Sequence, residues 1–202
     1  MVKQGKLDSS ILEQRSTKGA DIEEDSLYFK PAEYRQIIEL PGGYTTDIEN
    51  EYQAMTELHE VAEDLVVKPY FLTDDPEGYV MEYIEGISLN KALNQEREVY
   101  NFEEVIEDLH SLGKTIRSEG IPHGDIRNRN FIVEDSGSLK AIDAAGIPED
   151  VESPGVGTLR DQAVIWDIVD INDIIDKIAD KTKTRIDAGE YHIETPVQNI
   201  TQ

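Results

Sequence analysis

The stretch of sequence that decides the fold is His123-Gly124-Asp125-Ile126-Arg127-Asn128-Arg129-Asn130-Phe131, a polar loop between two apolar segments. It carries a carboxylate, Asp125, and a later amide, Asn130. A second aspartate, Asp143, follows the apolar part of LKAID. Two carboxylates and an amide of this kind can hold a divalent cation against phosphate groups and orient an attacking hydroxyl.

Composition narrows the partners of the chain. Its 202 residues include 43 acidic and 19 basic ones, which gives a formal net charge of −24. Such a chain repels nucleic acid and anionic membranes, so we expect no direct binding to either. The acidic excess favours a salt-rich cytoplasm, where the Debye length falls to about 3 Å at 1 M salt, over a merely acidic mesophilic protein.

Several classes of site and location are excluded by what the chain lacks. Cysteine is absent, which rules out disulfides, thiolate metal sites and cysteine nucleophiles. No apolar run approaches the ~20 residues that span a bilayer, and the first residues lack the apolar core of a signal peptide. We therefore expect a cytoplasmic protein.

The first half of the chain predicts a strand-rich unit with one helix. Residues 1–10 are polar and expected to be flexible. Three strands are expected between residues 11 and 40, at ILEQRS, SLYFK and YRQIIEL. Thr46 or Asp47 can cap a helix, and two further strands, VVKPYFLT and GYVMEYI, flank a turn. The apolar positions expected on that helix are Ile48, Tyr52, Met55 and Leu58.

The second half predicts helices at its two ends and a hairpin between them. A helix starting near Asn101 has a regular apolar stripe, and a last helix has another. Two short strands, FIVE and LKAID, flank a turn at residues 136–138. The stripes comprise Val105, Ile106, Leu109, Leu112 and Ile116, and then Val164, Ile168, Ile171, Ile175 and Ile178. The fold class predicted is α+β.

This order of elements and motifs resembles the protein-kinase-like superfamily over residues 11 to 183. It is most similar to the small atypical archaeal kinases, the RIO group and the kinase associated with tRNA threonylcarbamoylation, which also read HGD in the loop. The resemblance implies a bilobal fold, with an N-lobe at residues 11–84 and a truncated, mainly helical C-lobe at residues 85–202. The acidic composition suggests a halophilic source.

The catalytic loop carries the strongest part of the resemblance. His123-x-Asp125-x4-Asn130 matches the family's H-x-D-x4-N. The resemblance assigns Asp125 to accepting or orienting the substrate hydroxyl and Asn130 to binding Mg²⁺. Arg127 would stabilise charge on the transferred phosphoryl group. His123 would brace the loop. The alternative is an ordinary polar turn after a helix.

The second metal ligand implied by the resemblance is Asp143, in the place of the DFG aspartate. The motif here reads Asp143-Ala144-Ala145-Gly146, so alanine replaces the phenylalanine and the glycine comes one residue late. Asp167, after Trp166, would bond the backbone of the catalytic loop, or would be an exposed acid in the first turn of its helix.

Nucleotide binding is expected along the connector Val80–Gly86, which resembles a kinase hinge. Met81 would be the gatekeeper, and the backbone of Glu82 and Ile84 would bond the adenine edge; an edge strand running into a loop is the alternative. The glycine-rich loop is poor, because Lys18-Gly19-Ala20-Asp21 offers only Gly19 and acidic residues follow it.

The lysine that the family pattern has on the third strand is missing from the expected position in this sequence. Glu51 lies on the apolar face of its helix, where the family has a glutamate that pairs with a lysine of the third strand. Aligning IIEL as that strand puts Glu39 at the lysine position. Lys30, which ends LYFK, could supply the charge instead, and Arg35 is a weaker candidate. For Lys30 we favour a surface position with the ammonium group in water, and Glu51 is equally compatible with a partly solvated acid.

Two functions remain. The first is an ATP- and Mg²⁺-dependent phosphotransferase, similar to atypical serine/threonine kinases, acting on a protein or small-molecule hydroxyl. The second is a pseudokinase that serves as a nucleotide-binding or scaffolding module. A metallophosphoesterase, suggested by Asp108-Leu109-His110, is set aside because these residues lie inside a periodic helix.

Overall fold

The computed structural model of the chain describes residue 11 and residues 27–32, 47–94, 102–147, 152–153, 157–182 and 188–195. The first half contains β1 (Leu27–Pro31), α2 (Ile48–Val61), β2 (Pro69–Asp74), β3 (Glu77–Glu82), β4 (Gly86–Ser88) and α3 (Leu89–Asn94). The second half contains α4 (Phe102–Glu119), the 3-10 helix η2 (Asn128–Asn130), β5 (Phe131–Glu134), β6 (Leu139–Ala141), β7 (Glu152–Ser153), β8 (Gly157–Thr158), α5 (Leu159–Thr182) and the 3-10 helix η3 (Ala188–Tyr191).

The first sheet is antiparallel, with the strand order β1-β3-β2. Its register places Lys30 of β1 opposite Tyr79 of β3, and Tyr28 opposite Met81. In β2 every second residue is buried, as expected for a strand with one face on the core. The sheet therefore brings the end of β1 beside the strand that leads into the expected hinge.

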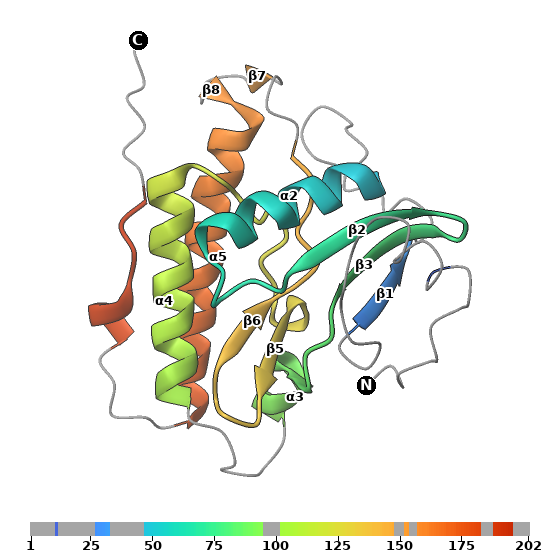
Figure 1. The fold of residues 1–202 in the computed structure, drawn as a ribbon. Helices are drawn as coiled ribbons and strands as arrows, with labels where there is room; N and C mark the ends of the chain where they lie inside the picture. Colours follow the sequence, from blue (N-terminus) through green and yellow to red (C-terminus); the bar gives the residue numbers. More distant parts are fainter. Residues whose placement is uncertain are drawn as a thin grey trace.

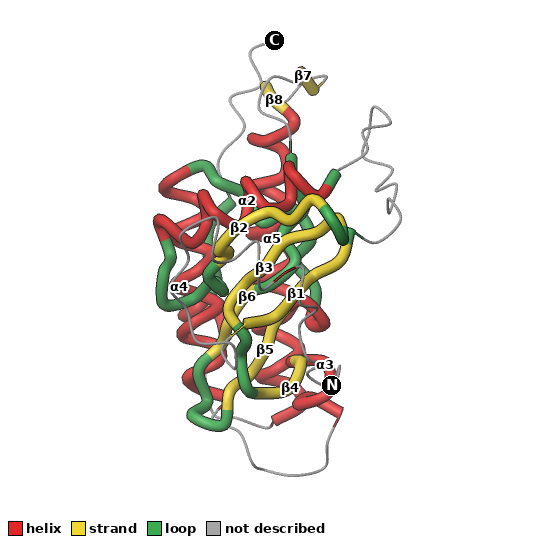
Figure 2. Tube along the Cα trace, turned by 45° about the vertical axis from the view of Figure 1, so that its right-hand side comes forward, coloured by secondary structure: helices red, strands yellow, loops and turns green. Residues whose placement is uncertain are grey.

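Helix α2 lies against this sheet and begins where the sequence predicts. Asp47 is its N-cap, and the Asp47 carboxylate accepts a hydrogen bond of 2.8 Å from the backbone N–H of Asn50. Ile48, Met55 and Leu58 form the buried stripe. The figures show α2 crossing between the sheet and the long helices (Figures 1 and 2).

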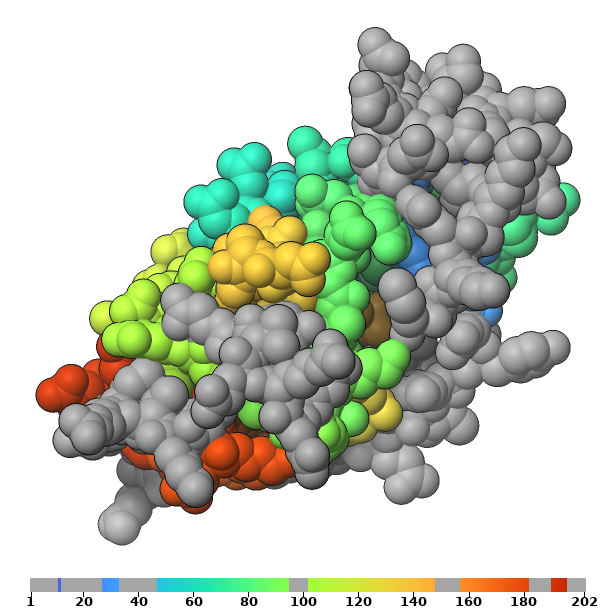
Figure 3. All heavy atoms as spheres, turned by 90° about the horizontal axis from the view of Figure 1, so that it is seen from below, coloured from blue at the N-terminus to red at the C-terminus, as the bar shows by residue number. Residues whose placement is uncertain are grey.

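The helical half is built on α4 and α5, which pack along each other (Figure 1). A second small sheet, in the order β4-β5-β6, lies beside them. Its β5–β6 hairpin reaches the surface between α4 and the segment around residues 80–90 (Figure 3). The buried residues of α4 include all five that the sequence predicts, and the predicted stripe of α5 is buried as well.

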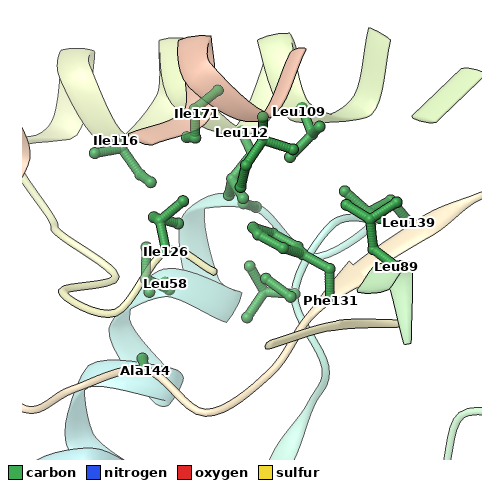
Figure 4. Close-up of a cluster of buried hydrophobic side chains, with 14 of the residues drawn as sticks. Leu58, Leu89, Leu109, Leu112, Ile116, Ile126, Phe131, Leu139, Ala144 and Ile171 are labelled. Atoms are coloured by element: carbon green, nitrogen blue, oxygen red, sulfur yellow. The ribbon is translucent and has the colours of Figure 1, made fainter. Parts of the chain in front are cut away.

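One hydrophobic core joins both halves. Figure 4 shows side chains of α4, among them Leu109 and Leu112, facing Phe131 and Leu139 of the hairpin, with Leu58 of α2 on the other side. Burial of such side chains contributes about 1.5–3 kcal/mol each, so this cluster fixes α2 and the hairpin relative to α4. The loop that carries Asp125 starts after α4 and ends at β5, so both its ends lie on these fixed elements.

The observed architecture confirms the α+β class and agrees with a small bilobal kinase-like fold. The strand predicted at SLYFK is β1, and those predicted at VVKPYFLT, GYVMEYI, FIVE and LKAID are β2, β3, β5 and β6. The strand predicted at ILEQRS is wrong at its only described residue, because Ile11 is helical. The strand predicted at YRQIIEL lies outside the described residues. No described helix is long and apolar enough to cross a membrane.

Candidate active site

The loop between α4 and β5 is held by one buried carboxylate. Asp167 of α5 is 2% exposed and accepts the backbone N–H of His123 at 2.6 Å and that of Gly124 at 3.0 Å. Gly124 has φ +78°, a conformation that favours glycine. Of the two alternatives for Asp167, the structure selects the one in which it bonds the loop backbone. Burial raises the pKa of Asp167 to about 7. The two hydrogen bonds oppose this rise but are weaker than the effect of burial.

His123 braces the same loop from inside. Its ring is fully buried, stacks on Phe131, and lies 2.9 Å from the carbonyl oxygen of Ile142 through Nε2. Burial lowers the pKa of His123, so the neutral ring donates from Nε2, while Nδ1 accepts the N–H of Asp125 at 3.3 Å. The imidazole thus joins the loop to the segment that carries Asp143.

Asp125 lies at the centre of a hydrogen-bonded group. Asn130, which is 3% exposed, donates from Nδ2 to the Asp125 carboxylate at 2.8 Å and to its backbone carbonyl at 2.9 Å. Arg127 donates from Nε to the other carboxylate oxygen at 2.7 Å, and a nitrogen of Arg129 lies 3.7 Å from the carboxylate. The structure therefore brings all three residues predicted as catalytic together. The sequence analysis did not single out Arg129, although its spacing from Asp125 could have indicated it.

Asp143 follows β6 in a left-handed backbone conformation, with φ +60°. Few residues other than glycine adopt this conformation, and aspartate is among those that tolerate it. Backbone hydrogen bonds hold both flanks: Ile142 donates to the carbonyl of Asn130 at 2.9 Å, and Ala145 donates to that of His123 at 2.7 Å. These backbone bonds therefore fix Asp143 beside the loop that carries Asp125.

The alanine and the late glycine in this motif have a packing reason. Ala144 is buried, and its N–H contacts the sulfur of Met55 in α2 at 3.3 Å. A Cβ added at Gly146 would lie 2.3 Å from the backbone of Asn50, also in α2. The segment after Asp143 is therefore packed tightly against the helix that carries Glu51.

Lys30 meets two carboxylates. Its Nζ lies 2.7 Å from Glu51 and 3.0 Å from Asp143, and it lies over the ring of Tyr79 at 5.6 Å. The surface position favoured for Lys30 is wrong, since its side chain is only 19% exposed. The reason is the sheet register, which turns the end of β1 toward α2. Glu51 is likewise a paired acid, with its side chain 25% exposed.

The protonation state of Lys30 follows from these contacts. Burial by itself would lower the pKa of its ammonium group, but the electrostatic interactions with Tyr79, Asp143 and Glu51 are stronger together and raise the pKa. Lys30 is therefore a fixed cation at neutral pH.

A cavity of about 310 Å³ opens beside this ion pair. Its lining includes Lys30 and Asp143 and the connector residues Met81 to Ile84. Its remaining walls are mostly apolar and include Tyr28, Val67, Ile132 and Ile142. Tyr28, which the sequence analysis did not single out, is the bulky residue of this wall. All the predicted binding residues that the structure describes therefore either line the cavity or pair with a residue that does.

The metal ligands proposed from the sequence are an amide and a carboxylate. Among the described residues, no three His, Cys, Asp or Glu side chains gather as a metal site. Asn130 uses Nδ2 toward Asp125, which leaves its oxygen as the atom that can bind a cation. Oxygen ligands of this type suit Mg²⁺, so Asn130 and Asp143 fit the ion chemically. Gly19, Glu39 and Arg35 lie outside the described residues.

Comparisons with known proteins support a kinase-like chain over part of its length. No family model matches it. It is 35% identical over 66 residues to a probable serine/threonine-protein kinase PknB of Lactococcus lactis, which covers 32% of this chain and 10% of that protein. It is 32% identical over 100 residues to a serine/threonine-protein kinase D of Synechocystis, which covers 50% of this chain and 19% of that protein. The matches thus span a fifth or less of these relatives. Neither relative is described as RIO-type or archaeal.

Proposed function

We propose that this chain is an ATP- and Mg²⁺-dependent phosphotransferase acting on a hydroxyl group. The observation that carries the proposal is the position of Lys30, which lies 2.7 Å from Glu51 and 3.0 Å from Asp143 at the wall of the 310 Å³ cavity. A fixed cation at the end of an apolar cavity suits a nucleotide, whose base is apolar on its faces and whose phosphates are anionic.

The walls of the cavity support adenine binding at the connector. Ile132 and Ile142 offer apolar contacts. The N–H of Glu82 is already bonded to the carbonyl of Lys68 at 2.8 Å, so the group of Glu82 proposed to bond the adenine edge is its carbonyl. The N–H of Ile84 is proposed as the second contact, and Met81 as the gatekeeper.

Asn130 and Asp143 would hold Mg²⁺ through their oxygens. When bound, the ion supplies positive charge beside the phosphates. Lys30 then keeps Asp143 oriented in the free protein, and the Glu51 pair keeps Lys30 at the cavity wall.

Asp125 would orient the acceptor hydroxyl and take its proton. In the transfer, a bond forms between the acceptor oxygen and the γ-phosphorus, the bond to the β,γ-bridging oxygen breaks, and ADP leaves. Arg127, 2.7 Å from Asp125, is placed to stabilise charge on the phosphoryl group.

A specific observation favours a pseudokinase as the second candidate. Both carboxylate oxygens of Asp125 already accept hydrogen bonds, from Arg127 and from Asn130. If these bonds persist with nucleotide bound, Asp125 has reduced capacity to accept a substrate proton. The chain would then bind nucleotide without transfer.

The excess of acidic residues supports the further proposal that this enzyme works in a salt-rich cytoplasm. A net charge of −24 on 202 residues destabilises a compact fold through self-repulsion, which salt screens.

The test is Mg²⁺-dependent ATP turnover in high potassium chloride. Wild type is compared with Asp125→Ala and Lys30→Ala. We expect turnover to fall at least a hundredfold for both variants, because Asp125→Ala removes the proposed base and Lys30→Ala removes the cation proposed to lie beside the phosphates. Tight ATP binding without turnover in wild type would favour the pseudokinase. Unchanged turnover in Asp125→Ala would overturn the proposed role of Asp125.

A further inference from the structure

A second cavity lies along the catalytic loop. Its volume is about 580 Å³, and its lining includes Asn90, Arg127, Arg129, Asp170, Asp173 and Lys177. None of these residues lines the 310 Å³ cavity. Helix α3 contributes to both cavities, because Lys91 lines the first and Asn90 the second. We call this second cavity the acceptor cavity.

Positive charge is concentrated in the acceptor cavity. The whole chain has only 19 basic residues against 43 acidic ones, yet Arg127, Arg129 and Lys177 line this single space. Two of them also contact the carboxylate of Asp125, at 2.7 Å and 3.7 Å. Cations are therefore placed beside the side chain that would orient an acceptor hydroxyl.

Arg127 and Arg129 can release the carboxylate of Asp125 and bind another anion instead. Their side chains are 58% and 54% exposed, so neither is locked in place by packing. A guanidinium group matches the geometry of a phosphate or carboxylate through two parallel hydrogen bonds. An anion that draws Arg127 and Arg129 away would leave an oxygen of Asp125 available to a hydroxyl beside it.

The same cavity also contains negative charge, which limits what it can accept. Asp170 and Asp173 face it from α5. Burial raises the pKa of Asp170, with Asp173 adding to the effect, whereas Lys177 and Arg127 lower it, so these groups interact across the cavity. Two carboxylates oppose a long polyanion but leave room for one anionic group near the arginines.

The geometry points to a small acceptor substrate that carries a phosphate or carboxylate group close to its reacting hydroxyl, with Arg129 and Lys177 holding that anionic group. This inference rests on the proposed phosphotransferase function, because it names the acceptor of the same reaction. Among the described residues, the basic side chains that contact Asp125 are Arg127 and Arg129, and both line a cavity distinct from the one proposed for the nucleotide.

The test uses three probes and does not depend on turnover. Binding of glycerol 3-phosphate, glycerate and neutral glycerol to the full chain is measured by calorimetry at one fixed ionic strength. We expect both anionic probes, or at least one of them, to bind tenfold or more tightly than glycerol, since charge-assisted hydrogen bonds are worth about this much. The stronger of the two identifies phosphate or carboxylate as the preferred group.

Variants locate the binding. Arg129→Ala and Lys177→Ala should each weaken binding of the preferred probe at least threefold. Lys114→Ala, which removes an exposed charge from α4 outside the cavity, should change it less than twofold. Equal affinity for glycerol and the anionic probes, or unchanged binding in both cavity variants, would overturn the inference.

ATP binding measured on the same wild-type sample separates this inference from the function on which it rests. If ATP binds with Mg²⁺ but the anionic probes do not bind, the inference is wrong and the proposed function stands. If a probe binds through Arg129 and Lys177 but ATP does not bind, the anion site is supported and the proposed function is overturned.

Discussion

Replacing Asp167 tests how the catalytic loop is held, and its effect depends on pH. The buried Asp167 carboxyl has a pKa of about 7 in the folded chain, against an ordinary value of 3.8. Because its pKa is raised on folding, the folded state binds this proton more tightly than the unfolded state. The resulting stabilisation is fully present below about pH 4 and is lost as the pH rises through 7.

The size of the effect follows from that difference in pKa. A change of one in pKa corresponds to 1.36 kcal/mol, so wild type should lose about 3 kcal/mol of this stabilisation between pH 5 and pH 8. Asp167→Asn cannot titrate, yet it keeps one oxygen that can accept the N–H of His123 or Gly124. The difference in unfolding free energy between wild type and Asp167→Asn should therefore shift by about 3 kcal/mol, with wild type relatively more stable at pH 5.

The assay is urea unfolding of both proteins at pH 5 and pH 8. The difference in unfolding free energy between the two proteins does not contain the contributions of the other acidic groups, because both proteins share those groups. Asp167→Ala gives a second comparison, because it leaves two buried N–H groups without this acceptor and should cost at least about 2 kcal/mol at either pH. A difference that stays constant with pH, or that favours wild type more at pH 8, would refute the reasoning.

Three other perturbations have defined outcomes. A double-mutant cycle of Lys30→Met and Glu51→Gln, measured by chemical unfolding, should give a coupling energy of about 1–3 kcal/mol, and a value near zero would mean that the pair is not formed. Gly146→Ala should destabilise by at least about 2 kcal/mol and weaken ATP binding, because its Cβ would meet the backbone of Asn50, whereas Gly120→Ala, with open space around it, should cost only about 1 kcal/mol. Raising potassium chloride from 0.1 M to 1 M should raise the melting temperature, because screening reduces repulsion in a chain of net charge −24, and a lower melting temperature would contradict this.

The elements that could be predicted from the sequence are those whose pattern is local. Helices α4 and α5 carry apolar residues at helical spacing, and the hairpin β5–β6 alternates around a clear turn. Asp125 and Asn130 could be placed together because both lie on one short loop that matches the H-x-D-x4-N pattern. These features need no knowledge of distant contacts.

The sequence offered Lys30 as a candidate partner of Glu51 but could not decide between this role and a surface position, because the choice depends on a non-local pairing of strands. Placing the strand before α2 at YRQIIEL put Glu39 in the position of the lysine, since that segment comes directly before the helix. In the structure, β1 pairs with β3, about fifty residues later in the chain, and this pairing turns Lys30 toward Glu51. For Asp167 the sequence left the loop-bonding role as one of two alternatives, because its partners lie 44 and 43 residues away.

The measurement that tests the central claim most directly is calorimetric titration of ATP in the presence and absence of Mg²⁺, with wild type and Lys30→Met. The claim is that Lys30, Glu51 and Asp143 form the phosphate end of a nucleotide site. It predicts that wild type binds ATP more tightly with Mg²⁺ than without it, and that Lys30→Met weakens binding at least tenfold. Binding that is absent, or that is unaffected by both Mg²⁺ and the loss of Lys30, would contradict it.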